Sequence, residues 1–140
     1  MDKDGAQADM PAAEELLDAA RDVHLSVGPH DRPPRSYRGH DFVWWLGVLG
    51  KWEMKLPPAG AEHVTIAVSG ANGGQTVDFR RFAAKGMTLV GMTRDCEDGV
   101  MRFAPDLAGN IAAGDANYLS ILDEADAYVA REGLELPLDP

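Results

Sequence analysis

The stretch from residue 64 to residue 91 most constrains the fold. It begins with a β-branched apolar run, Val64–Val68, continues through a glycine-rich loop and a helical pattern, and ends in a second apolar run, Met87–Gly91. Two short strands joined through a helix form a crossover, which sets them parallel. Strands also alternate with helices elsewhere in the chain. We therefore expect an α/β fold.

The remaining elements follow from local signals. We expect a helix over Pro11–Ala20 capped by Asp9, and a strand over Val23–Val27. Thr76 is the expected cap of the crossover helix, and Gly86 its stop. Asp98-Gly99 is a turn signal that would pair Val100–Phe103 with the strand before it. Three further helices are expected: Phe42 to about Trp52 opened by Asp41, Pro105–Ala113, and Ala116–Arg131 capped by Asp115 and stopped by Gly133.

Charge and cysteine content narrow the class of protein. The net charge is −10, which argues against nucleic acid or an anionic membrane as the main partner. The single cysteine, Cys96, excludes an internal disulfide and favours a reducing compartment. The longest apolar stretch, Phe42–Gly50, is too short to span a bilayer, and the N-terminus does not read as a secretory signal. We expect a cytoplasmic protein.

A basic loop stands out in this acidic chain. Residues 28–41 contain Arg32, Arg35 and Arg38 within seven positions, directly after a strand. Arginine suits phosphate because its planar fork forms two parallel charge-assisted hydrogen bonds. The alternative is a solvated loop stiffened by Pro33-Pro34. The spacing alone leaves both interpretations open.

Other constellations carry less information. The loop Gly70–Gly74 lies between a strand and a helix, where phosphates bind, yet it matches no established glycine motif, and a flexible connection is the favoured interpretation. The four histidines do not fall at metal-ligand spacings, so no metal site is expected. Acidic neighbours make Cys96 a poor nucleophile. Trp44, Trp45 and Trp52 on one short helix indicate either core or an interface.

Several stretches together resemble the middle section of FAD- and NADPH-dependent, monooxygenase-like flavoproteins with two dinucleotide-binding domains. The resemblance covers nearly the whole chain and depends on Arg21–Gly28, Asp31–Gly39, Asp41–Leu46, Gly73–Arg80, Gly86–Gly91, Phe103–Ala108, Asn110 and Gly114-Asp115. It implies a partial Rossmann-like, three-layer NAD(P)-binding domain with a helical C-terminal segment. Residues 1–104 would form the partial NAD(P)-binding α/β region, and residues 105–140 the helical segment and tail.

The resemblance also implies a cofactor site. Gly5 and Gln7 correspond to the end of a pyridine-nucleotide glycine motif, and the loop after the second strand would read the adenosine ribose. Its candidates for the 2′-phosphate of NADPH are Ser26, Arg32, Arg35 and Arg38. The sequence contains no G-x-G-x-x-G, neither for the pyridine nucleotide nor for FAD. NADPH binding would thus be weak or vestigial, and FAD is not expected to bind.

Three hypotheses follow, in order of preference. The first is a truncated or partial flavin-dependent NADPH oxidoreductase that is inactive alone, because the redox chemistry belongs to the absent flavin. The second is a small module that binds a phosphorylated ligand or nucleotide through the arginine loop. The third is an interaction protein that dimerises through the helix with Trp44, Trp45 and Trp52.

Overall fold

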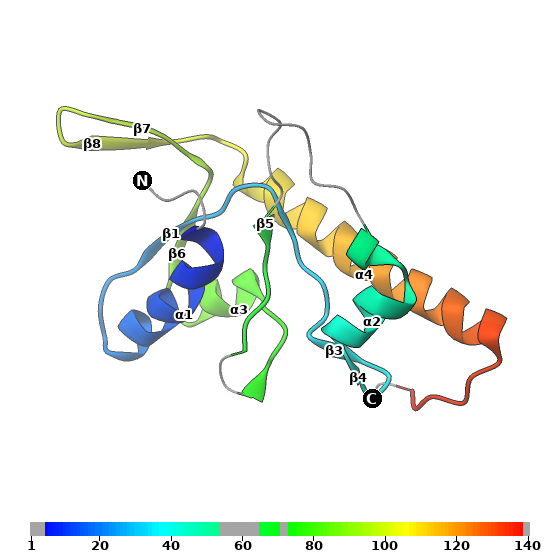
Figure 1. The fold of residues 1–140 in the computed structure, drawn as a ribbon. Coiled ribbons are helices and arrows are strands. Elements are labelled where there is room, and N and C mark those ends of the chain that lie inside the picture. The colour runs from blue at the N-terminus through cyan, green and yellow to red at the C-terminus, as the bar shows by residue number, and fades with distance from the viewer. Residues whose placement is uncertain (1–4, 54–64, 71–72, 139–140) are drawn as a thin grey trace.

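The computed structural model describes residues 5–53, 65–70 and 73–138, in which helices and short strand pairs are mixed along the chain. Residues 23–31 form a central extended segment that carries two strands (Figure 1). β1 (His24–Ser26) pairs in parallel with β6 (Thr88–Val90), and β2 (His30–Asp31) pairs in parallel with β5 (Thr65–Ile66). Pro29 interrupts the ladder because it has no N–H to donate. β6 therefore borders the first half of the central segment, and β5 the second half.

The crossover unit is present, with two differences from the expectation. The chain runs from β5 through α3 (Phe79–Ala84) to β6, but β5 and β6 flank the central segment and do not pair with each other. Asp78, and not Thr76, caps α3, because the Asp78 carboxylate accepts a 3.0 Å hydrogen bond from the Arg80 amide. The helix begins two residues later than expected, which frees the Thr76 hydroxyl for a different contact.

The first core lies around the central segment. α1 (Gly5–Asp18) starts earlier than predicted, so Asp9 lies inside the helix and does not cap it. Val23 and Val27 alternate with exposed neighbours, as expected of a strand with one buried face. The buried members of this core come from α1, the central segment, β5, α3 and the start of β6: Ala13, Val23, Val27, Ala67, Val77, Phe79, Phe82 and Met87.

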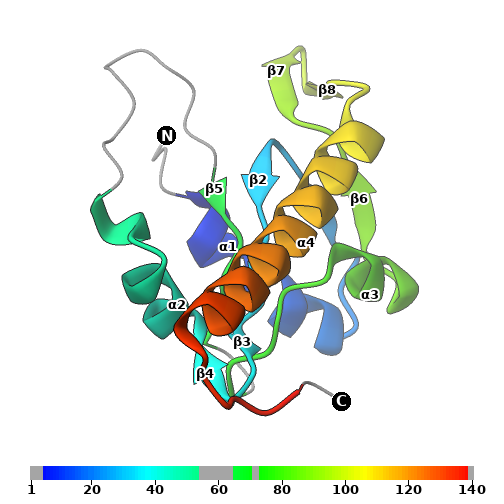
Figure 2. The same ribbon diagram turned by 90° about the vertical axis from the view of Figure 1, so that its right-hand side faces the viewer.

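One long helix replaces the two that were expected near the C-terminus. α4 (Leu107–Glu132) is continuous over 26 residues, or about 39 Å, and Figure 2 shows it crossing the whole molecule. Asp115 therefore does not act as a cap. The helix ends as predicted at Gly133, which adopts a left-handed φ of 63°. The buried face of α4 recurs at helical spacing through Asn110, Gly114, Ile121, Ala125 and Val129.

A second core joins α4 to the tryptophan helix. α2 (Phe42–Val48) begins as predicted, with the Asp41 carboxylate accepting from the Val43 amide at 2.9 Å. It ends before Trp52, at the turn through Gly50 (φ 70°), and η1 (Lys51–Glu53) follows. A hairpin of β3 (Ser36–Tyr37) and β4 (His40–Asp41), which the sequence analysis missed, leads into α2. Trp45, Ala125 and Val129 form the buried centre of this core.

A second hairpin projects from the body of the molecule, as Figure 1 shows. β7 (Thr93–Glu97) pairs with β8 (Val100–Phe103) through the turn at Asp98-Gly99, where both residues have positive φ. The turn was predicted correctly, but the partner of β8 was wrong. The chain forms the additional strand β7 after β6, because β6 is already paired with the central segment.

Candidate functional site

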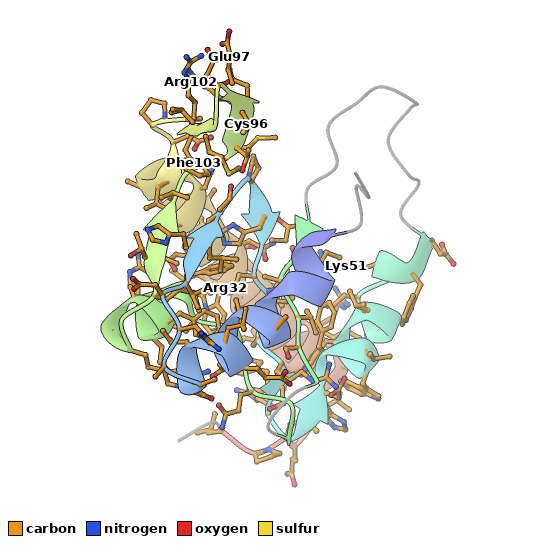
Figure 3. The ribbon with its side chains drawn as sticks, turned by 90° about the vertical axis from the view of Figure 1, so that its left-hand side faces the viewer. Arg32, Lys51, Cys96, Glu97, Arg102 and Phe103 are labelled. Atoms are coloured by element: carbon orange, nitrogen blue, oxygen red, sulfur yellow. The ribbon has the colours of Figure 1, made fainter. Side chains whose placement is uncertain are left out.

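Arg32 begins the arginine loop and points inward. Its guanidinium forms an ion pair with Asp115 (Nη2 to Oδ1, 2.9 Å) and donates to the carbonyl of Val77 (3.2 Å). Its amide donates to the side-chain oxygen of Asn117 at 3.0 Å, and its guanidinium stacks over Tyr118. Figure 3 shows Arg32 within the body of the molecule, away from the hairpin residues. The start of the loop is thus fixed to α4 by its backbone and its side chain.

Arg80 shares the carboxylate that Arg32 binds. Its Nη1 and Nη2 donate to Oδ1 and Oδ2 of Asp115 at 2.9 and 2.7 Å. The hydrogen bond from Arg80 is the main cause that lowers the pKa of Asp115 below its ordinary value, and Arg32 adds to the effect against partial burial. The same pairing raises the pKa of Arg80. Two cations therefore converge on one anion between the end of β2, α3 and α4.

Arg35 lies beside the glycine-rich loop. Its amide donates to the Thr76 hydroxyl at 2.9 Å, and its guanidinium pairs with Asp41 at 3.1 Å. A Cβ added at Gly74 would lie 3.0 Å from Arg35 Nε, so a glycine lets the two loops approach closely. The arginine loop and the later part of the glycine-rich loop, predicted separately, are neighbours.

Arg38 is separated from the other two arginines. Its Nε lies 3.0 Å from Asp126, which also accepts a 2.8 Å hydrogen bond from the Tyr37 hydroxyl. Asp126 follows Asp115 by 11 residues of one helix, which corresponds to about 16 Å along its axis. Arg38 and Arg32 are therefore held too far apart to bind one phosphate group together.

The other predicted cofactor residues are dispersed. Ser26 lies at the carboxyl end of β1, where its hydroxyl donates to the Gly91 carbonyl (2.8 Å) and accepts from the Thr93 amide (3.0 Å). Gly5 and Gln7 lie in the first turns of α1, and their side chains are outside the described part of the structure. The structure brings Arg32 and Arg35 together with the glycine-rich loop. It does not bring Ser26 or Arg38 to the same point.

The sequence analysis did not place Arg80 among the candidate cofactor residues, and it assigned Asp115 and Thr76 to helix caps. The signal for Arg80 was its place on the helix that follows the glycine-rich loop, in the sequence Asp78-Phe-Arg-Arg. An ordinary charged helix face has the same appearance. The partners of Arg80 and Arg32 are distant in sequence, so no local pattern reveals them.

The tryptophans have three different environments. Trp45 is only 2 % exposed and donates from Nε1 to the Tyr37 carbonyl at 2.9 Å. Trp44 stacks on His40 with ring centroids 3.8 Å apart. Trp52 is 62 % exposed. The core interpretation is therefore confirmed for Trp45. Trp52 lies on η1 and not on α2, and the interface interpretation stays a prediction.

Among the side chains that the structure describes, in residues 12–53, 66–70 and 73–138, no group of three or more histidine, cysteine, aspartate or glutamate residues is arranged to hold a metal ion. None of the helices in these ranges has the length and apolar character that a membrane span requires. Cys96 is exposed on β7, between two acidic residues.

Comparison of the chain with protein-family models, with curated proteins and with solved structures gives no match.

Proposed function

We propose that this chain is the NAD(P)H-binding section of a flavin- and NADPH-dependent, monooxygenase-like oxidoreductase, and that by itself it binds a phosphorylated nucleotide without redox turnover. The residue patterns described above support the family assignment. The arrangement of charges between the arginine loop and the glycine-rich loop supports phosphate binding. A reducing, cytoplasmic location fits a chain with one exposed thiol.

The order of the strands supports a Rossmann-like origin. A dinucleotide-binding sheet has the order 3-2-1-4, with strand 1 between strands 2 and 4. If the central segment is strand 2, β5 corresponds to strand 3 and β6 to strand 4. Removing strand 1 from that order leaves 3-2-4, which is the order of β5, the central segment and β6. The described residues before β1 form α1 and contain no strand.

The observation that carries the proposal is the place of Arg32. It directly follows β2, at the carboxyl edge of the central segment, where the ribose reader of such a domain lies. Its backbone and guanidinium are both held by described residues, Asn117 and Asp115 among them. A cation that is already ordered loses little conformational freedom when a phosphate binds.

Redox activity is not proposed for this chain. In an oxidoreductase of this kind, the flavin accepts the hydride from NADPH and activates oxygen. Both reactions belong to the flavin and not to the protein. Neither the sequence nor the described residues offer a glycine-rich cradle for the FAD pyrophosphate. Purified protein that carries flavin absorbance and oxidises NADPH would overturn this part of the proposal.

The test is calorimetric titration of the full chain with NADPH and with NADH, which differ only by the 2′-phosphate. We expect NADPH to bind more tightly, and Arg32→Gln to remove most of that difference. Arg38→Ala is the control, because Arg38 pairs with Asp126, which lies about 16 Å along α4 from Asp115, the partner of Arg32. Equal affinity for both nucleotides, or no binding of either, would contradict the proposal.

A second candidate function is interaction with another copy of the chain. Its support is Trp52, a large aromatic side chain that is 62 % exposed. Aromatic side chains of this kind are enriched at interfaces. Sedimentation of the natural protein against Trp52→Gln tests it. A monomer in both cases would exclude dimerisation through this surface.

A further inference from the structure

In the cluster of Arg32, Asp115 and Arg80, two guanidinium groups share one carboxylate, with three N–O distances of 2.9, 2.9 and 2.7 Å. A second carboxylate, that of Asp78, also lies close enough to raise the pKa of Arg80. The feature that points to an anionic ligand is therefore the geometry: two planar guanidinium forks converge on one position, as they do around a carboxylate or a phosphate.

The cluster faces the solvent on one side. The side chain of Arg80 is 61 % exposed, that of Asp115 is 31 % exposed, and that of Arg32 is 14 % exposed. Asp115 accepts two of the five N–H bonds of the Arg80 guanidinium. The cluster therefore has a partly buried arginine at its base and an accessible arginine at its rim.

Further donors lie around the same cluster. The Arg32 guanidinium donates to the carbonyl of Val77, in the segment 75–77 between the glycine-rich loop and α3. In the same segment the Thr76 hydroxyl accepts from the Arg35 amide, and Gln75 accepts from Arg81 Nη1 at 3.0 Å. Four arginines thus border the segment 75–77 and α3. Of these four arginines, only Arg32 and Arg35 are among the cofactor-binding residues that the resemblance to flavoproteins implies.

We propose that Arg80 determines phosphate recognition at this site and that Asp115 is a built-in competitor of the ligand. This inference rests on the proposed nucleotide-binding function and deepens it. A phosphate monoester takes the place of the Asp115 carboxylate between the two guanidinium groups, and Asp115 turns outward to solvent. A phosphate has more negative charge and one more acceptor oxygen than a carboxylate, so both arginines favour it.

If Asp115 competes with the ligand, substitutions of Arg80 and of Asp115 should change the affinity for NADPH in opposite directions. Arg80→Gln removes a charged donor and is expected to weaken NADPH binding about tenfold. Asp115→Asn removes the competing anion and is expected to tighten binding by about threefold to tenfold. Arg80→Lys keeps the charge but not the fork, and is expected to lie between the natural protein and Arg80→Gln.

The experiment is calorimetric titration of the full chain and each variant with three probes: NADPH, NADH and inorganic phosphate. Arg102→Gln is the matched control, because Arg102 is similarly exposed and paired with two acidic residues, but on the β7–β8 hairpin. Circular dichroism and thermal melting of every variant monitor the fold. The expected result is opposite shifts for Arg80→Gln and Asp115→Asn, with Arg102→Gln unchanged.

Each alternative outcome has a clear meaning. If the three residues only clip α3 to α4, both variants lower the melting temperature and leave the NADPH affinity unchanged, which overturns the inference. Weaker binding by Asp115→Asn overturns the competitor role. If inorganic phosphate binds in an Arg80-dependent way but NADPH does not bind, the nucleotide function fails while the phosphate site stands. If NADPH binds independently of Arg80, only the present inference fails.

Discussion

The imidazole of His30 lies against the backbone of Gly114, in the space that a side chain at position 114 would fill. His30 is fixed there, with Nδ1 3.0 Å from the Gly28 carbonyl oxygen and its ring edge-on to Phe79 at a centroid distance of 4.9 Å. The contact sets how closely α4 approaches β2. Because Arg32 follows β2 and Asp115 follows Gly114, the same contact also sets the position of the candidate site.

Because His30 lies against Gly114, we expect the substitution Gly114→Ala to change the stability of the protein in the direction opposite to that usual for glycine in a helix. Gly→Ala inside a helix ordinarily stabilises it by about 1 kcal/mol. Gly114→Ala is expected to destabilise the protein by about 1–3 kcal/mol, because the new methyl group overlaps a ring that is held by its neighbours. Gly109→Ala in the same helix meets no atom within 4 Å and is the control, expected to be neutral or stabilising. Urea denaturation measures both, and equal effects would contradict the packing argument.

Local chemistry predicted the ends of several elements. Asp41 caps α2 and Gly133 ends α4 because each acts on the backbone within a few residues. The turn at Asp98-Gly99 is equally local. β8 pairs with β7 and not with β6, and β6 is paired with β1. The residues of β1 lie more than 60 positions before β6, so the sequence around β8 does not reveal this pairing.

The candidate site was predictable only in part, for the same reason. Arg32 was identified by its position after a strand, but its partner lies 83 residues further along. An aspartate at position 115 reads as a helix cap in a local window, and the ion pairs that hold it come from the loop after β2 and from α3. Three arginines close in sequence proved to have three different carboxylate partners, Asp115, Asp41 and Asp126.

The second core predicts different consequences for two tryptophans. Trp45 is 2 % exposed and packs on Ala125 and Val129, so Trp45→Ala is expected to cost about 3–5 kcal/mol of unfolding free energy. Trp52→Ala is expected to change it by no more than about 0.5 kcal/mol in a monomer. Guanidinium denaturation followed by far-ultraviolet circular dichroism compares the two. A large, concentration-dependent effect of Trp52→Ala would instead support self-association.

The lowered pKa of Asp115 predicts a pH dependence of stability. The hydrogen bond from Arg80 is its first cause, and the ordinary value is 3.8. A carboxyl group with a lowered pKa in the folded state stabilises the fold above its ordinary pKa, and the contribution is lost as the pH falls through the lowered value. Asp115→Asn should therefore reduce the loss of stability below about pH 4. Asp123→Asn, at an exposed carboxylate of the same helix, is the control.

Denaturant titrations of the natural protein and both variants between neutral and acidic pH make that comparison. The unfolding free energies should differ most at neutral pH, where the ionised Asp115 contributes fully, and should converge under acid. A constant difference at all pH values would mean that the ion pairs of Asp115 with Arg80 and Arg32 do not contribute through its ionisation.

The raised pKa of Tyr37 predicts that stability is lost at alkaline pH, whereas the lowered pKa of Asp115 predicts a loss at acidic pH. Burial raises its pKa first, and the 2.8 Å hydrogen bond to Asp126 raises it further, against the effect of Arg38. A phenol with a raised pKa stabilises the fold below its ordinary value of 10.0, and the contribution is lost as the pH rises through the folded-state value. Asp126→Asn should lower the pKa of Tyr37 only in part, since burial remains. Phenolate absorbance, assigned by comparison with Tyr37→Phe, follows the titration, and an unchanged midpoint in Asp126→Asn would exclude a role for the carboxylate.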